Sequence, residues 1–173
     1  YSMGGVIAAS YSARNPDRVK RLILIATAGT GHNLGISARV AKIPVLGWVL
    51  FSAFFELQHV RSTKKDKNIK SSVPNIVARQ LNELLYKGFV PSVLASIKGI
   101  LSKDSYDDHK ALRNADFEIL AFWGDCDRVI PIQCKEVLSS WNSSINNVVI
   151  RKGSHSLPFT HARDIIDALH PRN

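Results

Sequence analysis

Three short stretches of this chain carry side chains suited to nucleophilic chemistry. The chain opens on "YSMGG", Tyr1–Gly5, in which a serine precedes two glycines and the start of a helical pattern. The stretch "WGDCDRVIP", Trp123–Pro131, holds two aspartates, and "GSHSLPFTHA", Gly153–Ala162, holds a histidine that follows an apolar run. A hydroxyl, an imidazole and a carboxylate are the groups used in acyl transfer through a covalent intermediate. Each stretch alone is also typical of ordinary structure: glycines permit close packing, Asp-x-Asp forms turns, and loop histidines are commonly exposed.

The elements around these stretches alternate between helix and strand. A helix is predicted directly after the two glycines and should end near Pro16, and the apolar run "VKRLILIATAG" then predicts a strand buried on both faces of a parallel sheet. Further on, Phe117–Phe122 predicts a strand, Gln133–Trp141 a helix, "NNVVIRKG" a last strand and Ala162–Leu169 a closing helix. This alternation indicates an α/β fold with a parallel sheet.

The middle of the chain, from Thr30 to about Leu101, predicts helices without strands. The predicted helices cover Ser37–Lys42, Leu46–His59, Ile76–Lys87 and Pro91–Leu101. The second of them is apolar nearly all round, which favours burial on two sides. The basic run "RSTKKDKNIK", Arg61–Lys70, is interpreted first as a solvated loop or helix face, with an anionic membrane surface or an acidic substrate as the alternatives.

Composition limits the class of protein. The 173 residues, 45% of them hydrophobic, suit one globular domain with a sizeable core. The net charge of +9 comes with no recognisable nucleic-acid-binding module, so nucleic acid is not expected as a partner. The two cysteines, Cys126 and Cys134, lack metal-ligand spacing and are interpreted as free thiols, which favours a reducing compartment such as the cytoplasm.

Together the three stretches resemble the motifs of the α/β-hydrolase fold family. Ser2-Met3-Gly4-Gly5 resembles the second half of the nucleophile elbow, Gly-x-Ser-x-Gly. "WGDCDRVIP" is similar to the acid loop of that family, and "GSHSLPFTHA" to its histidine loop. Serine, aspartate and histidine occur in the order typical of the family, each after a predicted strand, where ligand-binding groups gather in open α/β sheets.

The resemblance implies a role for each residue. Ser2 would be the nucleophile, His155 the general base and Asp127 the acid of a catalytic triad, and the backbone N–H of Met3 would serve the oxyanion hole. Gly4 would leave room for neighbouring backbone. Two nearby residues are assigned elsewhere: Asp125 is expected to shape the turn by binding backbone amides, and His161 to be a capping or surface residue.

The resemblance also divides the chain into parts. Residues 1–29 and 104–173 would belong to the core, and residues 30–103 would form a helical cap that selects the substrate. Within the cap, four aromatic residues are predicted either to line an acyl pocket or to pack the cap: Trp48, Phe51, Phe54 and Phe55. The expected substrate is a small-molecule acyl ester such as a monoacylglycerol or lysolipid, and no cofactor or metal is expected. A basic cap would also suit an acyl-carrier ester or a thioester, and Lys64, Lys65 and Lys67 would then meet an acidic carrier.

Three predicted strands make a thin sheet, so we expect the chain to be the C-terminal portion of the fold, with an N-terminal half as its partner. Two classes of function follow from this expectation. The chain is either part of an active serine esterase or lipase, inactive by itself, or a non-catalytic truncated homologue or binding module.

Overall fold

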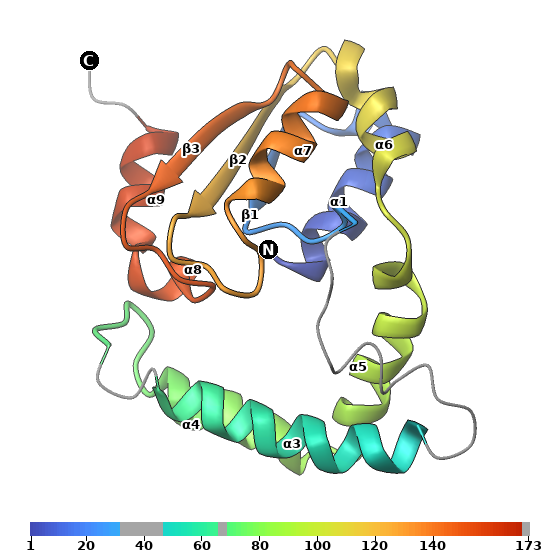
Figure 1. Cartoon of the computed structure of the whole chain (residues 1–173). Helices are drawn as coiled ribbons and strands as arrows, with labels where there is room; N and C mark the ends of the chain where they lie inside the picture. The colour runs from blue at the N-terminus through green and yellow to red at the C-terminus, as the bar shows by residue number, and fades with distance from the viewer. Residues whose placement is uncertain (32–46, 66–68, 171–173) are drawn as a thin grey trace. The chain divides into compact units, whose positions relative to one another are not determined.

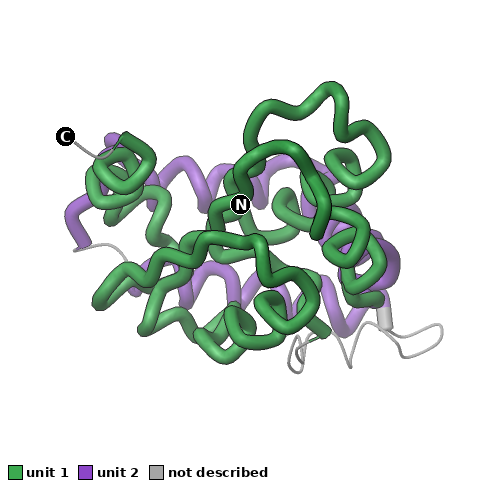
Figure 2. Tube along the Cα trace, turned by 90° about the horizontal axis from the view of Figure 1, so that it is seen from above, with its two compact units in different colours: residues 1–32, 103–173 green, residues 33–102 purple. Residues whose placement is uncertain are grey.

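The computed structural model describes residues 1–31, 47–65 and 69–170 of the chain. It divides into two compact units, one formed by residues 1–32 and 103–173 and the other by residues 33–102 (Figure 2). The helix predicted over Ser37–Lys42 lies outside the described residues. The interpretation of residues 30–103 as a cap stays a prediction.

The first unit is built on a parallel sheet, as predicted. Its strands are β1 (Arg21–Ile25), β2 (Glu118–Gly124) and β3 (Asn146–Ile150), in the order β1-β2-β3 (Figure 1). Because the strands are parallel and Ile25 lies opposite Phe122, the loops that follow them leave from one edge of the sheet. The central strand β2 is buried at every residue after its first.

The prediction that β1 is buried on both faces is wrong. Its residues alternate between buried and half-buried. Leu22 and Leu24 are buried, whereas Ile23 and Ile25 pack only in part against the cluster that α8 and α9 form with the sheet. A strand covered fully on one face and partly on the other shows this alternation, which the apolar run in the sequence hides.

Helices flank the sheet, and Figure 1 shows α7 and α9 on opposite sides of it. The helical elements of this unit are α1 (Met3–Arg14), η1 (Pro16–Arg18), α6 (Tyr106–Ala111), η5 (Leu112–Asn114), α7 (Gln133–Trp141), α8 (Leu157–Thr160) and α9 (Ala162–Leu169). The first helix, α7 and α9 match the predicted spans, whereas the short α6 and α8 were not predicted. Leu157 of α8 and Ile165 of α9 complete the apolar cluster over Phe122 and Ile150.

The described elements of the second unit are all helical. It contains α3 (Gly47–Lys65), α4 (Ile76–Asn82), η3 (Glu83–Leu85), α5 (Phe89–Lys98) and η4 (Ile100–Ser102). Phe51, Val90 and Leu94 form its buried cluster. The prediction that α3 is buried on two sides is wrong, because Trp48 and Leu57 are 55% and 61% exposed. Among the described residues of this unit, α4 and α5 cover one stripe of α3.

Among the described residues, no single helix has the length and apolar composition to cross a bilayer. By length and composition alone, Ile76–Leu85 and Phe89–Ser102 reach that threshold only when counted together, and the pair is bent by 89° at its break.

Candidate active site

Ser2 lies on a sharp turn at the start of α1. Its φ of 48° and ψ of −126° fall in a region that residues with a Cβ rarely occupy. Three main-chain hydrogen bonds hold it there: Ser2 donates to the carbonyl of Ile25 at 3.0 Å and accepts from Gly5 and Ala28 at 2.9 and 3.2 Å. Such a conformation costs about 1–3 kcal/mol, and residues held in this way gather at functional sites.

The close approach of α1 to the sheet depends on Gly5 and not on Gly4. A Cβ on Gly4 would meet nothing within 4 Å, which corrects the expectation that this residue makes room for backbone. A Cβ on Gly5, by contrast, would lie 2.7 Å from the Cβ of the buried Thr27 and 3.3 Å from its Cα. The second glycine therefore lets α1 start directly beside the end of β1.

Asp127 follows β2 and its side chain is fully buried. Its Oδ1 accepts hydrogen bonds from the backbone N–H groups of Val129 and Ile130, at 2.7 and 2.8 Å. Asp125 was expected to bind the amides of this turn, but it is exposed, and Asp127 accepts them instead. A carboxylate buried with satisfied oxygens keeps one orientation.

Two glycines join the loop of Asp127 to the loop of His155. A Cβ on Gly124 would lie 2.7 Å from the carbonyl carbon of Gly153, and the amide of Cys126 donates to the Gly153 oxygen at 2.9 Å. The loops can touch only because neither glycine has a side chain. Sequence reasoning missed this role, although both residues were present in the quoted motifs.

His155 lies between Asp127 and Ser2. Its Nδ1 is 2.8 Å from Asp127 Oδ2, and its Nε2 is 3.1 Å from Ser2 Oγ. A neutral imidazole that donates from Nδ1 to the carboxylate presents the lone pair of Nε2 to the serine hydroxyl. The side chain of His155 is 22% exposed. The structure thus brings together Ser2, Asp127 and His155, which are distant in sequence.

Met3 and His161 lie close in sequence to Ser2 and His155. Met3 is the first residue of α1, so its N–H has no acceptor within the helix and lies next to Ser2. His161 is the residue before α9, as expected, and its Nδ1 is 2.8 Å from Thr160 Oγ1. No side-chain hydrogen bond from His161 caps that helix.

The four aromatic residues proposed for an acyl pocket have different environments. Phe51 is fully buried, and its ring stacks on Phe55 with centroids 5.4 Å apart. Trp48 is largely exposed. Phe54 lines a hollow of about 390 Å³ with Leu57, Gln58, Arg61, Ser62 and Lys65.

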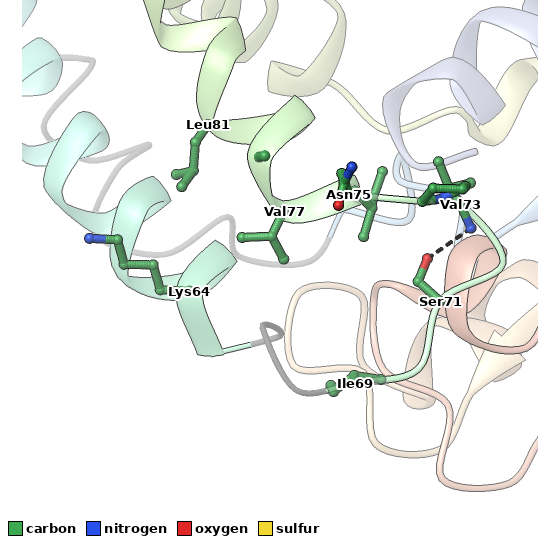
Figure 3. Close-up of a pocket in the computed structure, with 10 residues that line it drawn as sticks. Lys64, Ile69, Ser71, Val73, Asn75, Val77 and Leu81 are labelled. Atoms are coloured by element: carbon green, nitrogen blue, oxygen red, sulfur yellow. Dashed lines mark hydrogen bonds between the residues drawn. The ribbon is translucent and has the colours of Figure 1, made fainter.

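A larger hollow in the same unit lies between the end of α3 and α4 and has none of these four aromatic residues in its lining. Its volume is about 720 Å³, and Lys64, Ile69, Val73, Val77 and Leu81 are among the residues that line it (Figure 3). Among the described residues that line it, Lys64 is the charged one.

Among the described residues, no group of three or more His, Cys, Asp or Glu side chains is arranged to hold a metal ion. Cys126 is exposed and Cys134 buried, and both are free thiols. A hydrogen bond with Asp125 raises the pKa of Cys126, and burial raises the pKa of Cys134, which disfavours the reactive thiolate at both positions.

Comparison with known proteins identifies the family. The model of the alpha/beta hydrolase fold family matches residues 1–162, so the chain belongs to this family. Its relatives include the 2-hydroxymuconate semialdehyde hydrolase of Pseudomonas sp. (strain CF600), 27% identical, and the pimeloyl-[acyl-carrier protein] methyl ester esterase of Shewanella woodyi, 22% identical. The matches cover 93% and 95% of this chain but only 56% and 64% of those proteins.

Solved structures agree on the fold. A thermophilic esterase from Thermogutta terrifontis superimposes with a TM-score of 0.66 at 20% identity, covering 97% of this chain and 60% of that one. The enol-lactonase from Burkholderia xenovorans LB400 gives a TM-score of 0.67 at 16% identity, covering 97% and 61%. The chain therefore spans roughly 60% of the length of the proteins it matches.

Proposed function

We propose that this member of the α/β hydrolase fold family is a serine hydrolase of carboxylic esters, in which Ser2, His155 and Asp127 form the catalytic triad. The observation that carries the proposal is the unbroken series of hydrogen bonds from Ser2 Oγ through the imidazole to the buried Asp127 carboxylate. The strained main chain of Ser2 supports it, because residues held in such conformations gather at functional sites. The hydrolases among the relatives are consistent with it.

In the proposed mechanism, Ser2 Oγ attacks the ester carbonyl while His155 Nε2 takes its proton. Asp127 keeps Nδ1 protonated and stabilises the imidazolium that forms. The new C–O bond turns the carbonyl oxygen into an oxyanion, which the N–H of Met3 stabilises together with the positive end of α1. His155 then gives the proton to the departing alkoxide, the C–O bond to the alcohol breaks, and an acyl-serine remains.

Hydrolysis of the acyl-serine repeats these roles with water. His155 removes a proton from the attacking water, and the second tetrahedral intermediate collapses to the free acid and the Ser2 hydroxyl. No cofactor is needed in either half, because the proton, the nucleophile and the charge stabilisation all come from the protein and water.

For the substrate we propose an acyl ester with an apolar acyl group, held by the helices of residues 33–102 acting as a cap. Support comes from the apolar side chains that this unit exposes, Trp48, Leu57 and Phe54 among them. A second candidate is an ester on an acidic carrier protein. It is favoured by the exposed basic end of α3, where Arg61, Lys64 and Lys65 gather, and by the relative that is a pimeloyl-[acyl-carrier protein] methyl ester esterase.

The triad is tested by labelling the full-length protein with a fluorophosphonate probe and mapping the modified residue. We expect the label on Ser2 and its loss in Ser2→Ala, with an unchanged thermal unfolding temperature. Labelling of another residue, or a folded protein that neither reacts nor turns over esters, would refute the triad and favour a non-catalytic homologue.

The two substrate classes are separated by charge reversal. Lys64→Glu/Lys65→Glu should lower kcat/KM on a carrier-protein ester by about tenfold, with little change on a small neutral ester. The matched control is Lys20→Glu/Lys103→Glu, which changes the charge equally at exposed residues of the first unit. Equal rates on the carrier ester in both variants would remove the second candidate.

A further inference from the structure

We infer that Tyr1 is a positioning residue for His155, an inference that rests on the proposed function. The hydroxyl of Tyr1 donates a hydrogen bond of 2.8 Å to the main-chain carbonyl of His155, across 153 intervening residues. Tyr1 is covalently joined to Ser2. The Tyr1 side chain therefore connects the turn that carries the Ser2 hydroxyl with the loop that carries the His155 imidazole.

The ring of Tyr1 makes a second contact with the same residue. The centroids of the Tyr1 and His155 rings are 5.1 Å apart, with the planes tilted by 37°. The Tyr1 ring also meets Phe159 of α8 edge-on, with centroids 6.2 Å apart. Phe159 thereby restrains Tyr1, and Tyr1 restrains both the main chain and the ring of His155.

The contacts of Tyr1 fix the main chain of His155, which the hydrogen bonds of the imidazole do not fix. The bonds to Asp127 and Ser2 fix the two nitrogens, but they run through the side chain and do not set where the loop places the Cα of His155. The preceding main chain is strained, since Lys152 has a φ of 58°. The bond from Tyr1 holds the His155 carbonyl, so the 3.1 Å distance from Nε2 to Ser2 Oγ depends on it.

A positioning role predicts an effect on the chemical step. Tyr1 does not touch the Ser2 hydroxyl proton itself, so it contributes by keeping the acceptor nitrogen within reach. Tyr1→Phe keeps the ring contacts and removes one neutral hydrogen bond, which should lower kcat about three- to tenfold with KM unchanged. Tyr1→Leu removes the ring as well and should lower kcat about 30-fold.

The test compares kcat and KM for an ester in the full-length protein and in Tyr1→Phe and Tyr1→Leu. Tyr11→Phe is the matched control, because Tyr11 is an exposed tyrosine of α1 outside the group of Ser2, His155 and Asp127. A second readout is the proton NMR signal of the His155 Nδ1–H in the protein without substrate. We expect this signal to broaden in the order wild type, Tyr1→Phe, Tyr1→Leu, and not in Tyr11→Phe.

Unchanged kcat and an unchanged Nδ1–H signal in Tyr1→Phe would overturn the inference. A change of KM in either direction with kcat unchanged would also overturn it, because Tyr1 would then act on substrate binding. If Tyr1→Leu fails to fold, Tyr1→Phe still decides. Failure of the proposed function is distinguishable, since Ser2→Ala would then match the wild type in ester turnover and in probe labelling, whether both are present or both absent.

Discussion

The loops that carry Ser2, Asp127 and His155 and the helices of residues 33–102 hold their side chains by different means. In the loops, directed hydrogen bonds set the position of single atoms, and both Asp127 oxygens have donors. In the helices, Phe51 is fully buried by apolar packing while Trp48 on the same helix is 55% exposed. The first region should therefore be sensitive to the exchange of one atom, and the second to the loss of volume.

The largest effect is expected at Asp127 of the acid loop. Asp127→Asn keeps an oxygen for the backbone amides but places an NH2 group against His155 Nδ1, so the imidazole must present the wrong tautomer to Ser2. We expect kcat to fall about 10³- to 10⁴-fold in a steady-state ester assay. Asp125→Asn is the control and should stay near wild type, because Asp125 is exposed. Similar losses in both variants would contradict the site.

The second region is tested by truncating two phenylalanines of α3. Phe51→Ala empties a fully buried position and should lower the free energy of unfolding by about 3–5 kcal/mol. Phe54→Ala alters a side chain that is 37% exposed and should cost about 1 kcal/mol or less. Urea titrations measure both, and equal costs would show that packing in α3 is not one-sided.

A pH effect is expected from His109, which lies in the first unit but outside the loops. It is fully buried, neither ring nitrogen has a hydrogen-bond partner among the described residues, and its ring lies 6.5 Å from that of Trp141. Burial lowers the pKa of His109 from 6.5 to about 4, although the nearby Asp108 charge acts to raise it. The unfolded chain therefore takes up the proton first as the pH falls.

The consequence is a loss of stability between about pH 6.5 and pH 4, of up to about 3 kcal/mol. Above pH 6.5 the contribution is fully present, because His109 is neutral in both states. Unfolding free energies of wild type and His109→Leu at pH 7, 5 and 4 isolate the effect. A wild type whose pH dependence matches that of His109→Leu would rule out His109 as its source.

The smallest effect is expected at the adjacent glycines of α1. Gly5→Ala forces a Cβ against Thr27 and should lower the free energy of unfolding by about 1–3 kcal/mol. Gly4→Ala meets nothing and should raise it by up to about 1 kcal/mol, because alanine favours helix over glycine. Thermal unfolding of the pair decides, and destabilisation by Gly4→Ala would mean that its surroundings are tighter than described.

The sequence by itself determined the elements and their order. Apolar runs predicted β1, β2 and β3, and Gln133–Trp141 and Ala162–Leu169 were predicted with the bounds observed for α7 and α9. These features depend on residues that are close in the chain, such as helical periodicity and caps, so a local pattern is enough to predict them. The order of Ser2, Asp127 and His155 along the chain is visible in the same way.

Tertiary structure alone decided which of several similar residues does what. Asp127 and not Asp125 receives the backbone amides, Gly5 and not Gly4 meets Thr27, and Phe51 and not Trp48 is buried. The contact of Tyr1 with His155 and the positive φ of Ser2 belong to the same class. Gly5, Phe51 and Tyr1 have partners more than twenty residues away in the chain, and His155, which pairs with Asp127, lies 28 residues from it. Such partners are set by strand register and packing, which no local pattern of residues contains.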